Sequence, residues 1–480
     1  MSVVRVVNIT PVELSEEVDL AWQPSLGVNP ANPDKIVIVF HKTPPGNVGY
    51  WYSSDRGQTW QLVSQPGDQA DQSVGLGASG VLYWAIALTP TETTVNLEVL
   101  RTADLLNGPF TQIDNTPVRT EFDQPYVHAF SYRPPMPPDV DKLYIGYLDR
   151  SQNIWHSMIA TLDVCLDAKA ASPIFTPVVL NPRPIVPPQD GYEVRPAAHS
   201  DGTVYVAYKG YTVPYNGVTE TVFTNIVVAR DDGWGSGGFK DLTDPDGKAG
   251  RIVRPNVRIF DGPTTFLGNQ RLNNDLSIAV DPTNSDKLYI VWGDNANSNY
   301  TLRVRRSLDQ WGNYGGRGNH WSGDLLTVDN AVLACLAINS DGRVGFMYQK
   351  LVANKWETHF QRTTDNTGTN WDDIILARTK VPTNVTADYS RLIAVGRDFY
   401  GVFPAWNIPN PANYPATPAT ASNPNGATFL RNTTKTAPWE LRGTGATINT
   451  PINPSVDPYF FMVAEDGPAP PTNLTGIVDG

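Results

Sequence analysis

Cysteine, methionine and long apolar segments are all scarce in this chain. Its 480 residues include only 2 cysteines and 5 methionines. Cys165 and Cys335 stand far apart in the sequence, so we expect two separate buried thiols rather than a disulfide framework. No apolar run approaches the roughly 18 residues that a membrane-spanning helix requires. The sequence therefore predicts neither a disulfide-stapled scaffold nor a membrane span.

Basic residues and helical periodicity are also in short supply. Lys and Arg number 36 against 48 Asp and Glu, which gives a formal net charge of −12. Because phosphate binding needs clustered cations, we expect no nucleic-acid partner. Helical windows are interrupted by 41 Pro and 39 Gly residues. Together with 13 Trp and 20 Tyr, this composition is typical of an all-β protein with many turns.

The most informative motif that the sequence does contain is Ser53–Trp60, which fits the pattern Ser-x-Asp-x-Gly-x-Thr-Trp. The Ser and Asp oxygens can accept hydrogen bonds from N–H groups of their own turn. Gly57 supplies backbone freedom, and Trp60 offers a large apolar face to a neighbouring sheet. We call such a segment a box. Less regular copies occur at Thr363–Trp371, Ser307–Trp311 and Arg230–Trp234.

A longer unit repeats along the chain at intervals of roughly 50 to 80 residues. Each unit has a short first strand with small residues, a turn, and a second strand rich in Tyr and Val. Small residues in the first strand suit the crowded centre of a propeller, where inner strands converge. The units are Pro24–Val28 with Lys35–Phe40, Ser73–Leu76 with Val81–Ala85, Pro125–His128 with Lys142–Tyr147, Arg195–Ala198 with Thr203–Tyr208, Leu276–Val280 with Lys287–Trp292, Val332–Leu336 with Arg343–Tyr348, and Tyr389–Ile393 with Phe399–Phe403.

The box and the repeat together resemble the sialidase-like, Asp-box (BNR repeat) superfamily across most of the chain. This resemblance implies an all-β fold, a single seven-bladed β-propeller of sialidase-like type; six blades are the alternative, because sialidases have six. A two-sheet sandwich fits the regular spacing poorly. We expect residues 1–467 to form the propeller, closed by N- and C-terminal strands with Val3–Val7 at the seam, and residues 468–480 to form an extended Pro-rich tail.

Three segments are similar to motifs that carry the sialidase active site. The family opens its first blade with Arg-Ile-Pro-Ser-Leu after an aromatic residue, and here Trp22 stands in the arginine column before Gln23-Pro24-Ser25-Leu26. Glu193 is spaced like the catalytic Glu of the family. Tyr389-Ser390-Arg391-Leu392 resembles the run that carries the nucleophilic Tyr. The resemblance thus makes Glu193 and Tyr389 candidate catalytic residues.

Departures from the family argue against classical sialidase activity. Trp22 cannot act as a bidentate carboxylate clamp, and Lys209, where a second arginine is expected, is only a point charge. The sixth inner strand, Val332–Cys335, has no cation, and the loop His41–Asn47 lacks the acid/base Asp. The set is therefore incomplete. We predict that ligand contacts come from Trp22, Lys209, Arg195 and Arg391.

Two histidines extend the catalytic hypothesis. His128 and His199 lie on the third and fourth inner strands and are candidate general bases in a propeller lyase or hydrolase. An activated Tyr389 would also need a neighbouring carboxylate such as Glu193 to take its proton. The alternative is structural: Tyr389 packs in an inner strand, Glu193 caps a turn, and the histidines form hydrogen bonds within the fold.

Acidic residues recur where inner strands are expected to begin. If those positions are equivalent, carboxylates would ring the axial channel and attract Ca²⁺ or Mg²⁺, with Asp123, Asp275 and Asp388 as the main ligands. The alternative is that each Asp caps its own turn. We expect no required cofactor, and a Ca²⁺ ion on or near the propeller axis stays a hypothesis. The acids are Asp71, Asp123, Glu193, Asp275, Asp329 and Asp388.

The resemblance and the abundant Trp and Tyr favour carbohydrate recognition at the central funnel, with a glycan or polysaccharide as partner. One alternative is a glycoside hydrolase or polysaccharide lyase, and another is a non-enzymatic propeller that binds protein. Residues Met1 to Asn8 alternate like a strand, so we expect no signal peptide in this chain. The compartment stays open, with an extracellular or cell-surface location favoured.

Overall fold

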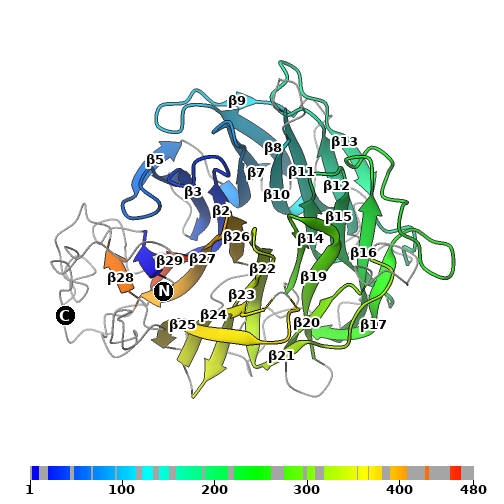
Figure 1. Ribbon diagram of the computed structural model, residues 1–480. Helices are drawn as coiled ribbons and strands as arrows, with labels where there is room; N and C mark the ends of the chain where they lie inside the picture. Colours follow the sequence, from blue (N-terminus) through cyan, green and yellow to red (C-terminus); the bar gives the residue numbers. More distant parts are fainter. Residues whose placement is uncertain are drawn as a thin grey trace.

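The computed structural model is a ring of β-sheets around a central axis (Figure 1). It contains 29 strands within the residues that it describes. Those residues are 3–9, 20–43, 48–65, 69–91, 94–114, 122–132, 140–150, 158–185, 190–213, 221–260, 275–295, 300–308, 318–353, 355–365, 367–380, 390–407, 428–431 and 455–465. The arrangement is a seven-bladed β-propeller, which confirms the fold predicted from the sequence repeat.

Six blades follow one another along the chain, each with four antiparallel strands ordered from the axis outward. Blade 1 contains β2 (Leu20–Val28), β3 (Ile36–Thr43), β4 (Val48–Ser53) and β5 (Gln61–Gln65), and blade 2 contains β6 (Gln69–Leu76), β7 (Leu82–Thr91), β8 (Thr94–Thr102) and β9 (Thr111–Gln112). Blade 3 contains β10 (Phe122–Tyr132), β11 (Val140–Asp149), β12 (Ile159–Cys165) and β13 (Thr176–Val179), and blade 4 contains β14 (Asp190–Ala198), β15 (Val204–Tyr211), β16 (Thr221–Asp231) and β17 (Arg251–Phe260). Blade 5 contains β18 (Leu276–Asp281), β19 (Asn284–Asp294), β20 (Thr301–Arg306) and β21 (Leu326–Asp329), and blade 6 contains β22 (Ala331–Ile338), β23 (Val344–Val352), β24 (Lys355–Thr363) and β25 (Trp371–Lys380).

Blade 7 combines strands from both parts of the chain. Its inner strands are β26 (Arg391–Val395) and β27 (Asp398–Asn407), and β27 pairs with β29 (Ser455–Ala464). The N-terminal strand β1 (Val3–Asn8) then adds to β29 in antiparallel register, and β28 (Thr428–Arg431) follows in parallel. Backbone hydrogen bonds between β1 and β29 therefore tie the start of the chain to its last described strand.

Seven hydrophobic clusters fill the interfaces between neighbouring blades. Between blades 1 and 2, for example, Val37 and Tyr50 pack against Val74 and Trp84. The second strands contribute most because both of their faces are covered; every residue of β15 is buried. Every pair of adjacent blades has a cluster of this kind. The core is thus a set of interblade layers arranged around the axis.

The box Ser53–Trp60 forms the turn between β4 and β5 at the rim of blade 1. Asp55 Oδ1 accepts from the backbone N–H groups of Gln58 and Thr59 at 3.0 and 2.9 Å. The Trp60 ring packs edge-on to Phe460 of blade 7, with ring centroids 5.2 Å apart. Gly57 has φ 79°, and a Cβ there would overlap the ring of Phe460. The turn therefore acts as a wedge between blades 1 and 7.

Related turns lie at the rims of three other blades. In blade 6, Asp365 accepts from backbone N–H groups of its own loop, and the indole N–H of Trp371 donates to the Gly368 carbonyl at 3.1 Å. In blade 4, Asp231 plays the same part for Gly233 and Gly235. In blade 5, Trp321 donates to the Gly318 carbonyl at 3.0 Å. The Trp311 that the sequence pattern suggested lies outside the described residues.

The described residues contain no helix of the length and apolar character needed to cross a membrane.

Candidate functional site at the propeller axis

Seven inner-strand residues share one register position close to the axis. They are recognised by their partners on the second strand of each blade, in the pairs Ser25–Val39, Ser73–Ala85, Tyr126–Gly146, Arg195–Ala207, Ser277–Val291, Cys335–Met347 and Arg391–Val402. We call this set the axial ring. Its members range from small hydroxyls to two guanidinium groups, although the backbone around them repeats. The side-chain chemistry of the axis therefore differs from blade to blade.

A backbone irregularity precedes the axial ring in several blades. The register shifts just before Ser25, Tyr126 and Cys335, and in blade 4 just before Val194, the neighbour of Arg195. The residue two positions before the member of the axial ring has a left-handed φ in each case: 54° at Gln23, 50° at Gln124, 97° at Glu193 and 61° at Leu333. Such φ values are costly for residues with a side chain and gather at functional sites. The start of the inner strands is therefore the part of the propeller to examine for a site.

Glu193 and Arg195 form the centre of the site. The Arg195 guanidinium donates to Glu193 Oε1 at 2.7 Å, and Glu193 is only 2% exposed. Glu193 Oε2 has no hydrogen-bond partner, and Lys209 Nζ lies 3.9 Å from it. Burial raises the pKa of the Glu193 carboxyl to about 8, although Arg195 and Lys209 oppose the rise. Glu193 therefore holds a proton more tightly than an exposed glutamate does.

A second buried carboxyl group lies behind this pair. Asp275, from the start of blade 5, accepts from the Tyr300 hydroxyl at 2.7 Å and from the Ala334 N–H at 2.9 Å. Burial raises its pKa, which those hydrogen bonds and Lys209 oppose. Lys209, on β15, is fully buried, so its pKa is lowered, while Glu193 and Asp275 favour its charged form. One buried cation thus serves two carboxyl groups.

Arg391 extends from β26 across the axis. Its guanidinium donates to Ser25 Oγ at 3.0 Å and to Ser73 Oγ at 3.1 Å. It also donates to the backbone carbonyl groups of Val74 and Val127. A residue of blade 7 is in this way bound to the inner strands of blades 1, 2 and 3. This side chain was predicted to bind ligand, and in the structure its two terminal NH2 groups donate to the protein.

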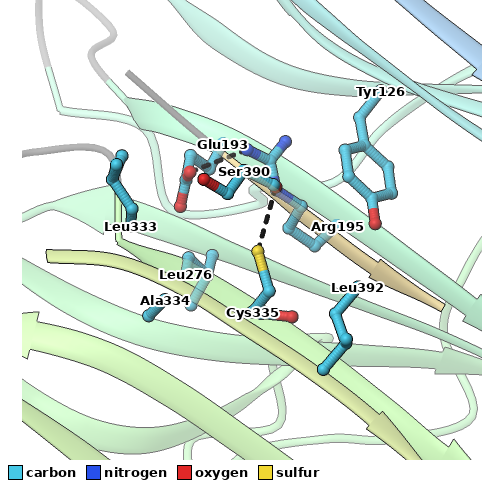
Figure 2. A pocket seen from close by; sticks show the side chains of 10 residues that line it. Tyr126, Glu193, Arg195, Leu276, Leu333, Ala334, Cys335, Ser390 and Leu392 are labelled. Carbon is cyan, nitrogen blue, oxygen red and sulfur yellow. Dashed lines mark hydrogen bonds and ion pairs between the residues drawn. The ribbon is translucent and has the colours of Figure 1, made fainter. Parts of the chain in front are cut away.

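A pocket opens beside the Glu193–Arg195 pair, with Tyr126 on one side and the strands of blades 5 to 7 on the other (Figure 2). Its lining residues are Tyr126, Glu193, Arg195, Leu276, Ser277, Leu333, Ala334, Cys335, Ser390 and Leu392. The Cys335 thiol donates to the Ser390 carbonyl at 2.9 Å, and burial raises its pKa. A protonated, buried thiol is a poor nucleophile, so Cys335 lines the pocket without acting as a nucleophile.

The two histidines lie away from the Glu193 carboxyl. His128 Nε2 accepts from the Ala198 N–H at 3.2 Å, and burial, aided by Arg391, lowers the pKa of the ring to about 3. His128 is therefore neutral and already used as an acceptor between β10 and β14. His199 begins the turn after β14, at the opposite end of that strand from Glu193, with Nδ1 2.9 Å from Asp201 Oδ1.

The remaining predicted site residues are dispersed or not described. Asp123 pairs with Arg150 at the start of β10, and Asp329 ends the outermost strand of blade 5 rather than beginning an inner strand. Within the described ranges, no three His, Cys, Asp or Glu side chains lie close enough to hold one metal ion. Tyr389 and Asp388 fall in the undescribed residues 381–389. The backbone of Trp22 pairs with His41, but its side chain is not among the described parts of the chain.

Sequence reasoning missed Tyr126 and Tyr300. Tyr126 stood within a repeat unit and was interpreted as a strand residue. Its position two residues after Gln124, matching Arg195 after Glu193, becomes visible only when the inner strands are aligned by their pairing partners. Tyr300 belongs to no sequence motif, and it reaches Asp275 from the position just before the third strand of blade 5.

No model of a known protein family matches the chain, and no curated protein is similar to it in sequence. Solved structures with a similar fold include an α-L-arabinanase from Penicillium chrysogenum in complex with arabinobiose, at 12% identity over 73% of this chain and 94% of that chain, with a TM-score of 0.43. A polysaccharide lyase family 25 ulvan lyase has 11% identity over 81% and 92%, with a TM-score of 0.49. The endosialidase of phage phi92 has 12% identity over 97% and 70%, with a TM-score of 0.41. At such low similarity the activity of this chain stays open.

Proposed function

We propose that the protein is a carbohydrate-recognising propeller that binds a glycan in the axial pocket. The observation that carries the proposal is the convergence of Glu193, Arg195 and Tyr126 on one pocket at the start of the inner strands. Carbohydrate hydroxyls both donate and accept hydrogen bonds. A carboxyl group with one unpaired oxygen, a guanidinium and an aromatic ring supply the matching polar and apolar contacts.

A glycan array followed by calorimetry with the glycans that respond tests this proposal. We expect binding by the wild-type chain and at least tenfold weaker binding by Glu193→Gln and Arg195→Lys, because each change alters a group that lines the pocket. His199→Gln is the matched control, since His199 lies at the other end of the same strand and should leave affinity unchanged. Wild-type protein that binds no neutral or charged glycan would contradict the proposal and favour a protein-binding scaffold.

A second candidate function is cleavage of the glycosidic bond, favoured by the state of Glu193. A carboxyl group that keeps its proton near neutral pH can donate it to the leaving oxygen of a glycoside. Asp275 is a second carboxyl group, but the Tyr300 and Ala334 donors hold it behind the pocket. Glycosidases place two carboxyl groups beside the scissile bond, which makes binding the better-supported function.

Incubation with polysaccharides separates cleavage from binding. New reducing ends without absorbance at 235 nm would indicate hydrolysis, and both signals together would indicate a lyase. If Glu193 is the proton donor, activity should decline as pH rises through about 8, and Glu193→Gln should abolish it. Binding without either signal leaves recognition as the function.

A further inference from the structure

Tyr126 lines the pocket, and its hydroxyl differs from those of several buried tyrosines, although the buried hydroxyls of Tyr289 and Tyr400 also have no hydrogen-bond partner in the part of the chain that the structure describes. The hydroxyl of Tyr50 donates to the Leu105 carbonyl, that of Tyr83 to Asp141, and that of Tyr300 to Asp275. The Tyr126 hydroxyl forms no hydrogen bond with any residue in the described ranges, and the side chain is half-buried in the pocket wall. Tyrosines with buried rings normally satisfy the hydroxyl. A hydroxyl that has no partner among the described residues, on a side chain that lines a pocket, is a candidate contact for a ligand.

Two guanidinium groups hold the Tyr126 ring. The Cζ atoms of Arg195 and Arg391 each lie 4.4 Å from its centroid. A cation over an aromatic face is attracted by the ring quadrupole, by about 0.5–2 kcal/mol depending on exposure. Arg195 belongs to the pocket wall, as Figure 2 shows, whereas Arg391 does not line it. The ring is therefore contacted by one residue that lines the pocket and one residue that does not.

Arg391 is itself held from three blades. Ser25 Oγ in blade 1, and Ser73 Oγ and the Val74 carbonyl in blade 2, accept from its guanidinium at 3.0 to 3.1 Å. The Val127 carbonyl in blade 3 accepts as well. A planar guanidinium bound in this way has little rotational freedom, so it presents a fixed face to Tyr126. A lysine at the same place would keep the charge but would lose both the fork of donors and the flat surface.

We propose that Tyr126 contacts the ligand through its hydroxyl and that Arg391 is the positioning residue that sets its ring. This inference rests on the proposed function, because it concerns the same axial pocket. It adds a ligand contact that no sequence motif marks and gives Arg391 an indirect role in place of the direct contact predicted from the sequence. Because Arg391 already restricts the Tyr126 ring, that side chain loses less conformational entropy when a ligand binds.

The test measures affinity for five named disaccharides, namely arabinobiose, cellobiose, chitobiose, digalacturonate and sialyllactose-derived sialylgalactose, by calorimetry. The one bound most tightly by the wild-type chain is then the probe. Tyr126→Phe keeps the ring and removes the hydroxyl, so we expect about tenfold weaker binding, the usual value of one lost hydrogen bond. Arg391→Lys should weaken binding several-fold. Arg397→Lys is the matched control, because Arg397 lies in the turn after β26 and binds Asp341 instead.

A double variant separates positioning from a general loss of structure. If Arg391 acts through Tyr126, Tyr126→Phe combined with Arg391→Lys should bind less weakly than the two single effects multiplied together. A purely structural Arg391 would give multiplicative losses that follow the thermal midpoint. Tyr126→Phe with wild-type affinity, while Glu193→Gln loses binding, would overturn this proposal and leave the proposed function intact. Absence of wild-type binding to all five disaccharides and to every glycan of the array would overturn both.

A measurement without ligand checks the free hydroxyl. N-acetylimidazole acetylates accessible phenols, and peptide mass spectrometry assigns the modified tyrosine. We expect Tyr126 to react at least tenfold faster than Tyr83 and Tyr300, whose hydroxyls are buried and bonded to carboxylates. Equal, slow reaction at all three positions would show that the Tyr126 hydroxyl is engaged and would overturn the proposal.

Discussion

The same backbone repeat carries similar side chains at the rim of this propeller and different side chains at its axis. At the rim, the indole N–H groups of Trp60, Trp321 and Trp371 donate to the carbonyl of the glycine three residues earlier at 3.2, 3.0 and 3.1 Å. At the axis, equivalent ring positions hold residues as different as Ser73, Tyr126 and Arg195. The rim turns are alike because each one packs against a neighbouring blade. Axial positions can differ because they face a shared space.

The largest loss of stability should come from adding a methyl group to the tightly packed turn at the rim. Gly57→Ala puts a Cβ into the ring of Phe460 at a residue with φ 79°, so overpacking and backbone strain add. We expect a loss of about 3 kcal/mol or more in the free energy of unfolding, measured with urea. Gly247→Ala is the control, since Gly247 has the same φ of 79° and nothing within 4 Å of the new Cβ. Equal losses in the two variants would mean that the wedge against blade 7 is unimportant.

Removing the carboxylate of the box should cost less. Asp55→Ala leaves the N–H groups of Gln58 and Thr59 without their acceptor and frees the Ser53 hydroxyl. We expect about 2 kcal/mol of lost stability by thermal or urea unfolding. Asp104→Ala provides the comparison, because Asp104 caps an exposed turn through the backbone N–H groups of Leu106 and Asn107. A loss at Asp55 no larger than at Asp104 would show that the box is an ordinary turn.

At the axis, stability should depend on pH through Glu193. Burial raises its folded pKa to about 8 from the ordinary value of 4.5. A carboxyl group with a raised pKa binds its proton more tightly when folded, so this stabilisation is complete below about 4.5 and is lost as pH rises through about 8. Glu193→Gln should therefore gain stability relative to wild type between pH 5 and pH 9, by about 1 kcal/mol or more. Urea midpoints at the two pH values measure it; a difference that stays constant would contradict the raised pKa.

The smallest change in stability is expected for a substitution in the axial ring, and it tests whether those positions tolerate a different side chain. Cys335→Ser keeps the donor to the Ser390 carbonyl, and three other blades hold serine at the equivalent position. We expect a change in stability of less than about 1 kcal/mol. A loss comparable to that of Gly57→Ala would mean that the axis is packed as strictly as the rim.

The blade pattern could be predicted because it is local. Each predicted unit contains the first two strands of one blade, from Pro24–Val28 within β2 to Phe399–Phe403 within β27. Alternation, turn residues and spacing all act over a few residues, and a propeller repeats them. The box at Ser53–Trp60 could be recognised in the sequence for the same reason, since Asp55 accepts hydrogen bonds from residues three and four positions further along the chain.

The composition of the axial site could be predicted only in part. Glu193 and Arg195 are two residues apart on one strand, so their pairing follows from the alternation of a strand. Tyr126 meets Arg195 and Arg391 across three blades, and no sequence pattern records that contact. The ring of acids assumed that Asp123 and Asp329 begin inner strands in register. A bulge in β10 puts Gln124 at that position instead, and Asp329 belongs to β21.

By itself the sequence determined an all-β chain of repeated strand pairs, the wedge turns at the rim and the acidic balance that disfavours nucleic acid. Those features depend on residue type and on neighbours along the chain. Only the tertiary structure decided which residues meet at the axis, because closing seven blades into a ring brings together residues as distant in sequence as Ser25 and Arg391. The same closure buries Glu193 beside Lys209 and Asp275, and burial is what changes the protonation of that carboxyl group.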